Sequence, residues 1–104
     1  MGEIGGFIDV FPYLAVNTQM CKIRFLGYIL PLTRVEFEIL RALAFSDGAL
    51  DRRAIVDCAS ENIKISPRSI SVHICSINKK ARDIGGRNLV VMLRDKGYLF
   101  EKYP

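Results

Sequence analysis

The side chains best suited to chemistry lie between residues 66 and 84, where small, polar and basic residues recur at helical spacing. Ser66 and Pro67 predict the helix start, because proline at the first helical position lacks an N–H that would have no partner there. Apolar residues every three or four positions predict a stripe that faces a core: Ile70, Ile74, Ile77, Ala81 and Ile84. The opposite face carries Arg68, Ser69, Val72, His73, Ser76, Lys79 and Lys80.

Such a face is suited to a groove of nucleic acid. Short side chains let the helix backbone approach base edges in a major groove about 12 Å wide. Basic side chains at its ends can reach phosphates and fix the register. The same composition also occurs on ordinary solvated helix faces, so this pattern fits both a nucleic-acid-binding face and a solvated face.

A predicted hairpin follows this helix directly. Leu89–Leu93 and Tyr98–Glu101 read as strands joined by the tip Arg94-Asp95-Lys96-Gly97. At such a tip, Arg94 and Lys96 could enter a narrow minor groove. A charged hairpin tip is also a common feature that keeps proteins soluble. The nucleic-acid interpretation is favoured here because the tip directly follows the helix in the chain.

The charge distribution favours a polyanionic partner. Residues 1–67 carry seven Lys/Arg against eight acidic residues, whereas residues 68–104 carry eight against three. The net charge of +4 is therefore concentrated in the part of the chain that holds the helix and the hairpin tip.

Enzymatic and cofactor-dependent functions find little support. The sequence has no glycine-rich phosphate loop and no paired-carboxylate motif. His73 and Cys75 stand two positions apart on a helix and therefore point in different directions. We predict a protein that is not an enzyme and that needs no cofactor.

The cysteines predict free thiols. Cys21, Cys58 and Cys75 follow no metal-ligand spacing, and a single histidine gives a zinc site little to work with. We expect no metal site, and we expect Cys58 to pack between helices. With no signal-peptide pattern and no apolar run near the roughly 20 residues of a membrane span, the prediction is a cytoplasmic protein.

The remaining segments must position the helix and the hairpin. Thr33, with Glu36 three residues later, predicts a capping box that starts a helix. Asp51 caps a shorter second helix. Short β-branched stretches ahead of them predict four strands: Phe7–Phe11, Tyr13–Val16, Lys22–Phe25 and Tyr28–Pro31. The chain reads as one domain, 1–104, of class α+β, with a sheet at about 7–31, helices at about 33–45, 51–59 and 66–84, and a hairpin at about 88–101.

The chain resembles the winged-helix DNA-binding (effector) domain of OmpR/PhoB-type bacterial response regulators over nearly its whole length. The first helix matches at Leu32-Thr33, Glu36-Phe37 and Leu40, and the second at Leu50 with Arg52. The later matches are Ser69-Ile70, Val72-His73-Ile74, Lys79-Lys80 and Arg94-Asp95-Lys96-Gly97-Tyr98-Leu99-Phe100.

The resemblance implies a winged helix-turn-helix with an N-terminal four-stranded antiparallel sheet, three helices and a C-terminal β-hairpin wing. It implies sequence-specific binding of double-stranded DNA for transcription regulation, with head-to-tail pairs on direct repeats. Val72, His73 and Ser76 match base-reading positions, and Arg68 and Ser69 match phosphate-contacting ones. Lys79 and Lys80 match positions where the family carries basic residues, and Arg94 matches the wing arginine that enters the minor groove. Residues 60–66 match a loop that often contacts RNA polymerase.

Several positions depart from the family pattern. Ser71 replaces an acidic residue, Asp95 replaces the wing glycine, and Cys75, Ser76 and Asn78 replace basic residues. Because each neutralised phosphate adds to the counterion-release contribution, we expect weaker non-specific DNA binding than in typical relatives. These losses keep an alternative open: a winged-helix protein-interaction module, for example for RNA polymerase contact, with weak or lost DNA binding. Relatives usually carry a receiver domain ahead of this one.

Overall fold

The computed structural model describes residues 6–61 and 63–101. Its N-terminal part is a four-stranded antiparallel sheet in the order β1-β2-β3-β4. The bounds of these strands are β1 Ile8–Phe11, β2 Leu14–Asn17, β3 Lys22–Phe25 and β4 Tyr28–Ile29. Three α-helices follow, α1 Arg34–Ala44, α2 Arg52–Ala59 and α3 Ile70–Gly85, and then a hairpin of β5 Val90–Leu93 and β6 Gly97–Phe100. The predicted order of elements is confirmed.

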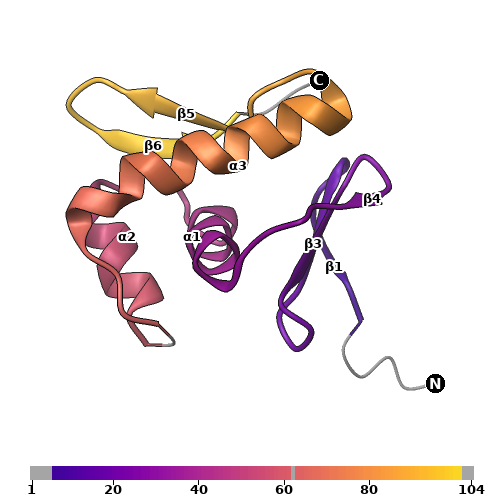
Figure 1. Cartoon of the computed structure of the whole chain (residues 1–104), viewed down its shortest axis with the longest axis horizontal. Coiled ribbons are helices and arrows are strands. Elements are labelled where there is room, and N and C mark those ends of the chain that lie inside the picture. The colour runs from indigo at the N-terminus through magenta and orange to yellow at the C-terminus, as the bar shows by residue number, and fades with distance from the viewer. Residues whose placement is uncertain (1–5, 62, 102–104) are drawn as a thin grey trace.

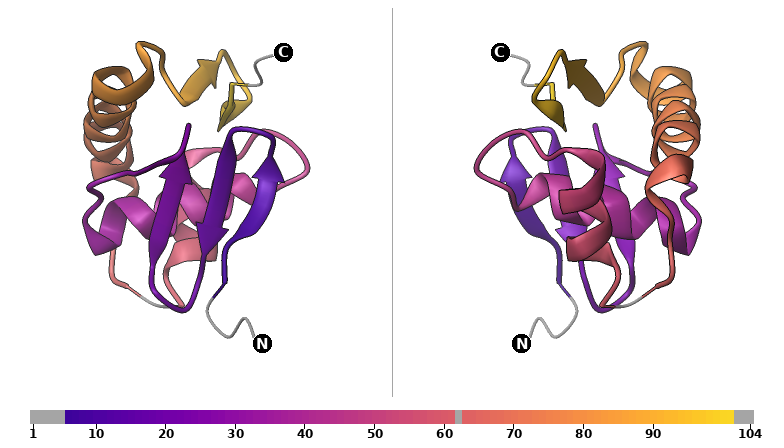
Figure 2. Two further views of the ribbon diagram at one scale, coloured as in Figure 1. Left: turned by 90° about the vertical axis from the view of Figure 1, so that its right-hand side faces the viewer. Right: turned by 90° about the vertical axis from the view of Figure 1, so that its left-hand side faces the viewer.

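The sheet forms one layer against the helices, and α3 runs along the hairpin with its C-terminal end next to the sheet (Figures 1 and 2). Strand β2 is central, with Val16 paired to Ile23 of β3 and Ala15 paired to Arg24. The last strand is shorter than predicted. The Leu30 N–H still donates to the Ile23 carbonyl over 2.9 Å, but Pro31 has no N–H with which to extend the ladder.

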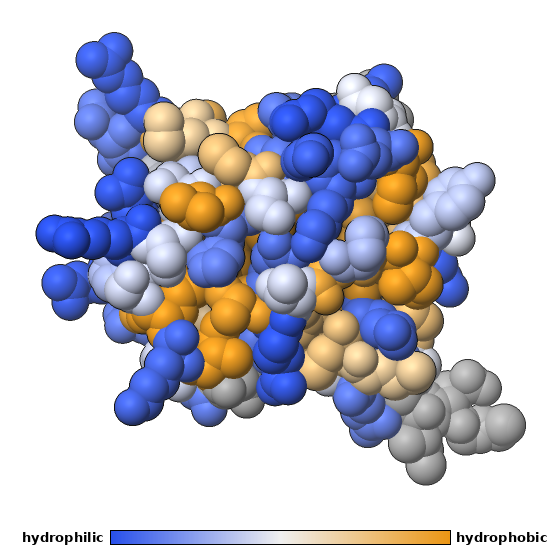
Figure 3. Space-filling view, in the orientation of Figure 1, coloured by the Kyte–Doolittle hydropathy of each residue, from blue (hydrophilic) through white to orange (hydrophobic). Residues whose placement is uncertain are grey.

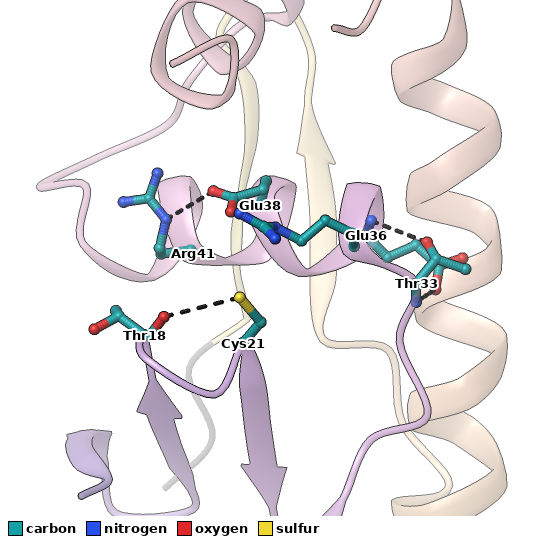
Figure 4. A network of polar contacts seen from close by, with 7 residues as sticks. Thr18, Cys21, Thr33, Glu36, Glu38 and Arg41 are labelled. Carbon is teal, nitrogen blue, oxygen red and sulfur yellow. Dashed lines mark hydrogen bonds and ion pairs between the residues drawn. The ribbon is translucent and has the colours of Figure 1, made fainter. Parts of the chain in front are cut away.

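Helices α1 and α2 begin as their cap residues predict. The Thr33 hydroxyl accepts the Glu36 N–H over 3.2 Å, and Glu36 Oε1 accepts the Thr33 N–H over 3.0 Å (Figure 4). This is the complete capping box. Asp51 accepts the Ala54 N–H over 2.8 Å at the start of α2.

The approach to α3 differs from the predicted continuous helix. Pro67–Ser69 form a single 3₁₀ turn, and the α-helix begins only at Ile70. The Ser66 side chain makes no capping hydrogen bond. Instead, its carbonyl accepts both the Ser69 N–H (3.1 Å) and the Ser69 hydroxyl (2.9 Å), and this favours the tighter i→i+3 turn. Gly86 ends α3 with a φ of 72°, a conformation that favours glycine.

A single apolar core joins the sheet, the helices and the hairpin. Its largest fully buried side chains include Phe25, Phe37, Leu40, Ile55, Ile70, Ile77 and Leu89. One expectation was wrong: Cys58 is exposed on α2 rather than packed between helices, because the inward positions of that short helix are Ile55 and Ala59. Among the described residues, no helix is both long and apolar enough to cross a membrane.

Candidate nucleic-acid interface

A row of exposed residues, the outward row, runs from the 3₁₀ turn before α3 along the side of α3 that faces away from the core. It consists of Arg68 in the turn and of Val72, Cys75 and Lys79 on the helix. Val72 is 68% exposed, so its side chain is accessible to a ligand. Arg68, Val72 and Lys79 were predicted site residues, whereas Cys75 was not. Its place between Val72 and Lys79 could have been found from helical spacing alone.

Two other predicted residues point toward α1 instead. The Ser76 hydroxyl donates to Glu36 Oε2 over 2.6 Å, and the Lys80 ammonium contacts Glu36 Oε1 at 2.5 Å. Both are half-buried, and we call this pair the α1-facing flank. The polar groups of Ser76 and Lys80 therefore bind Glu36 within the protein, whereas the sequence predicted both residues on the exposed face of the helix.

Glu36 holds this flank together as an anion. It is 4% exposed, and burial by itself raises the pKa of a carboxyl group. Hydrogen bonds from Lys80, Ser76 and the Thr33 N–H, with the positive charge of Lys80, outweigh that effect and hold the pKa of Glu36 below its usual range. Glu38, also buried, has its own partners: Arg34 and Arg41 each place Nε 3.0 Å from its carboxylate (Figure 4).

Asn78, one of the residues that replace a basic residue of the family, lies inside the fold and not on the exposed side of α3. Its side chain is buried, and its Nδ2 donates to the Val90 carbonyl over 2.9 Å. Its Oδ1 accepts the N–H groups of Leu89 and Val90, each over 2.9 Å. One amide thus satisfies three backbone groups and fixes the start of β5 against α3.

The hairpin tip projects beyond α3 and carries Arg94, Asp95 and Lys96, all exposed (Figure 1). Asp95 adopts a φ of 66°, and the Lys96 N–H donates to the Leu93 carbonyl over 3.1 Å to close the turn. Both predicted wing residues, Arg94 and Lys96, therefore lie on a tight projecting turn. In Figure 3 hydrophilic groups gather at this tip and over the C-terminal half of α3.

The tip end of the hairpin is fixed to the segment before α2. Leu50 and Tyr98 exchange two backbone hydrogen bonds, of 2.8 and 2.7 Å. Gly97 lies so close to this segment that a Cβ there would stand 2.3 Å from the Leu50 carbonyl oxygen. Only glycine allows that approach, so the position of the tip depends on it.

The other predicted residues lie at the edges of the candidate surface. Ser69 and His73 are half-buried, and the Ser69 hydroxyl is bonded to Ser66. In the loop predicted to contact polymerase, residues 60–66, Glu61 and Lys64 are exposed, and Asn62 lies outside the described residues. Arg52 and Arg53 are exposed at the start of α2, and they were not among the predicted site residues.

Comparison with protein-family models gives no match, and neither does comparison with curated protein sequences. Solved structures do match. The DNA-binding domain of RstA from Klebsiella pneumoniae, solved in complex with the RstA box, has a TM-score of 0.70 at 25% identity, covering 91% of this chain and 96% of that one. The DNA-binding domain of CpxR from E. coli has a TM-score of 0.69 at 26% identity, covering 90% and 94%.

A third similar structure comes from a family of redox sensors in the streptococci that evolved from two-component response regulators. It has a TM-score of 0.75 at 18% identity and covers 89% of this chain but only 41% of that protein, so this chain spans less than half of its length. At that identity the likeness concerns the fold. The sheet, the three helices and the hairpin, together with the RstA and CpxR matches, show that this chain has a winged-helix fold similar to that of these DNA-binding domains.

Proposed function

We propose that this chain binds double-stranded DNA in a sequence-specific manner, as the output domain of a transcription regulator. Helix α3 enters a major groove and the hairpin tip reaches the adjacent minor groove. The observation that carries the proposal is the outward row of α3, which ends in exposed cations and lies beside a projecting cationic tip. The similarity to DNA-binding domains, including one solved with its DNA site, supports it.

We assign different DNA contacts to the different site residues. Val72, exposed at mid-face, is suited to contact base edges such as the thymine methyl group. Arg68, Lys79 and Lys96 are suited to phosphates, and Arg94 to the minor groove.

The half-buried residues Ser69, His73, Ser76 and Lys80 form the edge of the interface rather than its centre. Ser76 and Lys80 would have to leave Glu36 before they could bind DNA directly.

Further parts of the proposal concern assembly. Two copies would bind direct repeats head to tail, and exposed Glu61 and Lys64 in the loop 60–66 would be available to RNA polymerase. We further propose that the domain acts in the cytoplasm and that it acts by binding DNA rather than by catalysis.

A second candidate, a protein-interaction module with weak or lost DNA binding, is favoured by one observation. The ion pair with Glu36 withdraws Lys80 from the cations that could meet phosphates. This candidate would keep the fold and the exposed Val72 but would show little dependence of binding on salt.

Selection of bound sites from random duplex DNA, followed by salt titration of the best site, tests the proposal. We expect log K to fall linearly with log salt, and the double variant K79A/R94A to reduce the slope by about 2. The matched control is Lys22→Ala, which removes an exposed cation from β3 in the N-terminal sheet and should leave the slope unchanged. Absence of DNA binding at low salt would overturn the proposal and favour the protein-interaction module.

A further inference from the structure

A pocket lies between the hairpin, the start of α2 and the turn before α3. Its volume is about 480 Å³, within the range of small-molecule sites. Its apolar lining comes from Pro67, Met92, Leu93 and Tyr98. Met92 is 68% exposed and Leu93 is 38% exposed, so these large apolar side chains are left open to solvent. Contact of the hairpin tip with DNA does not account for them, because they precede the tip.

The rim of the pocket is cationic. Arg52 and Arg53 approach from α2, and Arg94 and Lys96 approach from the hairpin tip. Within the described part of the chain, none of these four side chains takes part in an ion pair. Two acidic residues, Asp51 and Asp95, also line the pocket, and Asp51 already accepts the Ala54 N–H as the cap of α2. The rim therefore has an excess of positive charge next to an apolar floor.

The pocket is held open by the backbone. The two hydrogen bonds between Leu50 and Tyr98 fix the hairpin to the start of α2, and the close approach of Gly97 to Leu50 leaves no space for sliding. Because the pocket is already formed in the free protein, a ligand loses no binding free energy to the ordering of the pocket walls.

We propose that this pocket binds an organic anion with an apolar body, that is, a carboxylate or sulfonate on a hydrocarbon or aromatic frame. The apolar body would cover Met92 and Leu93, and the anionic group would pair with Arg52 or Arg53, since guanidinium groups bind such anions through two parallel hydrogen bonds. A nucleic-acid phosphate would satisfy the cations but would leave the apolar floor in water. The combination of floor and rim therefore favours an amphipathic anion.

Arg94 belongs both to the rim of the pocket and to the proposed DNA contact. An anion bound on this shared rim would lower the positive potential around Arg94, which the proposed minor-groove contact uses, so occupancy should weaken DNA binding. This regulatory consequence rests on the proposed function, whereas binding of the anion does not.

Fluorescence titration of the full chain with anilinonaphthalenesulfonate tests the pocket, with neutral N-phenylnaphthylamine as the matched probe that lacks the sulfonate. We expect the anionic dye to bind about tenfold more tightly than the neutral one, as one charge-assisted hydrogen bond implies. Met92→Ser should weaken both dyes, and R52Q/R53Q should weaken only the anionic dye. Lys22→Gln, a charge change on the distant sheet, should alter neither.

Equal affinity for the two dyes, or an affinity that Met92→Ser leaves unchanged, would overturn the assignment. Displacement of the dye by inorganic phosphate as readily as by an organic carboxylate would also overturn it, because the apolar floor would then have no role. In a separate arm the dye should raise the apparent Kd for DNA. If the chain binds no DNA, the proposed function fails while the dye measurements still decide the pocket, and if DNA binds without competition, only the regulatory consequence fails.

Discussion

Lys79 and Lys80 are neighbours in the chain, yet they belong to two regions of α3 with different surroundings. Lys79 lies in the outward row with its side chain in solvent, whereas the Lys80 ammonium is 2.5 Å from the buried carboxylate of Glu36. Ser76 shares the partner of Lys80, and Asn78 is turned inward onto the hairpin. A basic or polar residue on this helix is therefore available to a ligand only where no neighbouring element supplies it with a partner.

Substitutions in these two regions of α3 should therefore affect different properties, the stability of the fold in one and ligand binding in the other. Changes at inward-bonded residues should alter the free energy of unfolding, because those side chains satisfy buried groups of α1 and β5. Changes in the outward row should leave that free energy nearly unchanged and should affect only what α3 binds.

The largest effect is expected for Asn78→Ala. The substitution leaves two N–H groups and one carbonyl at the start of β5 without partners, and we expect a loss of about 3 kcal/mol in the free energy of unfolding. Chemical denaturation measures it, with Cys75→Ala in the outward row as the control that should change by less than about 0.5 kcal/mol. Equal stability of the two variants would show that Asn78 does not fix the hairpin.

The next effect concerns Glu36→Gln. The variant keeps the size of the side chain but loses the charge that binds Lys80, and we expect a loss of about 2 kcal/mol at neutral pH. Because the pKa of Glu36 is lowered in the folded protein, its carboxylate stabilises the fold above its unfolded-state pKa, near 4.5. That contribution is lost as the pH falls through the lower, folded-state value.

Urea unfolding at a series of pH values checks this second prediction. The difference in unfolding free energy between the wild type and Glu36→Gln should shrink on acidification below about pH 4.5. A difference that stays constant down to the acid-unfolding limit would mean that Glu36 acts through its shape and not through its charge.

The local features of this fold were predictable from the sequence, whereas the partners across the fold were not. The capping box of Thr33 and Glu36 spans three residues, so the spacing alone predicts it. The other contacts of Glu36 join it to residues 40 and 44 positions away, and no periodicity in the sequence encodes that pairing. A polar residue such as Asn78 also reads as exposed until the strand that it bonds has been placed beside it.

The third prediction concerns Lys79 and Lys80 and tests the difference between the two regions of α3 most directly. Lys80→Met should cost about 1 kcal/mol of stability because it leaves Glu36 with one partner fewer, and Lys79→Met should cost almost nothing. On DNA the order should reverse. Lys79→Met should reduce the salt slope by about 0.9, and Lys80→Met should hardly change it. Equal reductions in slope would show that Lys80 leaves Glu36 for a phosphate when DNA binds.

The smallest effect is expected for Val72→Ala, which probes the centre of the outward row. At 68% exposure, Val72 contributes little to the core, so the free energy of unfolding should change by less than about 0.5 kcal/mol. Loss of an apolar contact with a thymine methyl group should nevertheless reduce discrimination at one position of the site by about 1 kcal/mol. Ile29→Ala removes an aliphatic side chain that is 45% exposed on the N-terminal sheet, and it should leave the selected DNA sequences unchanged. Identical site preferences for Val72→Ala and the wild type would mean that Val72 reads no base and that α3 binds DNA through its cations alone.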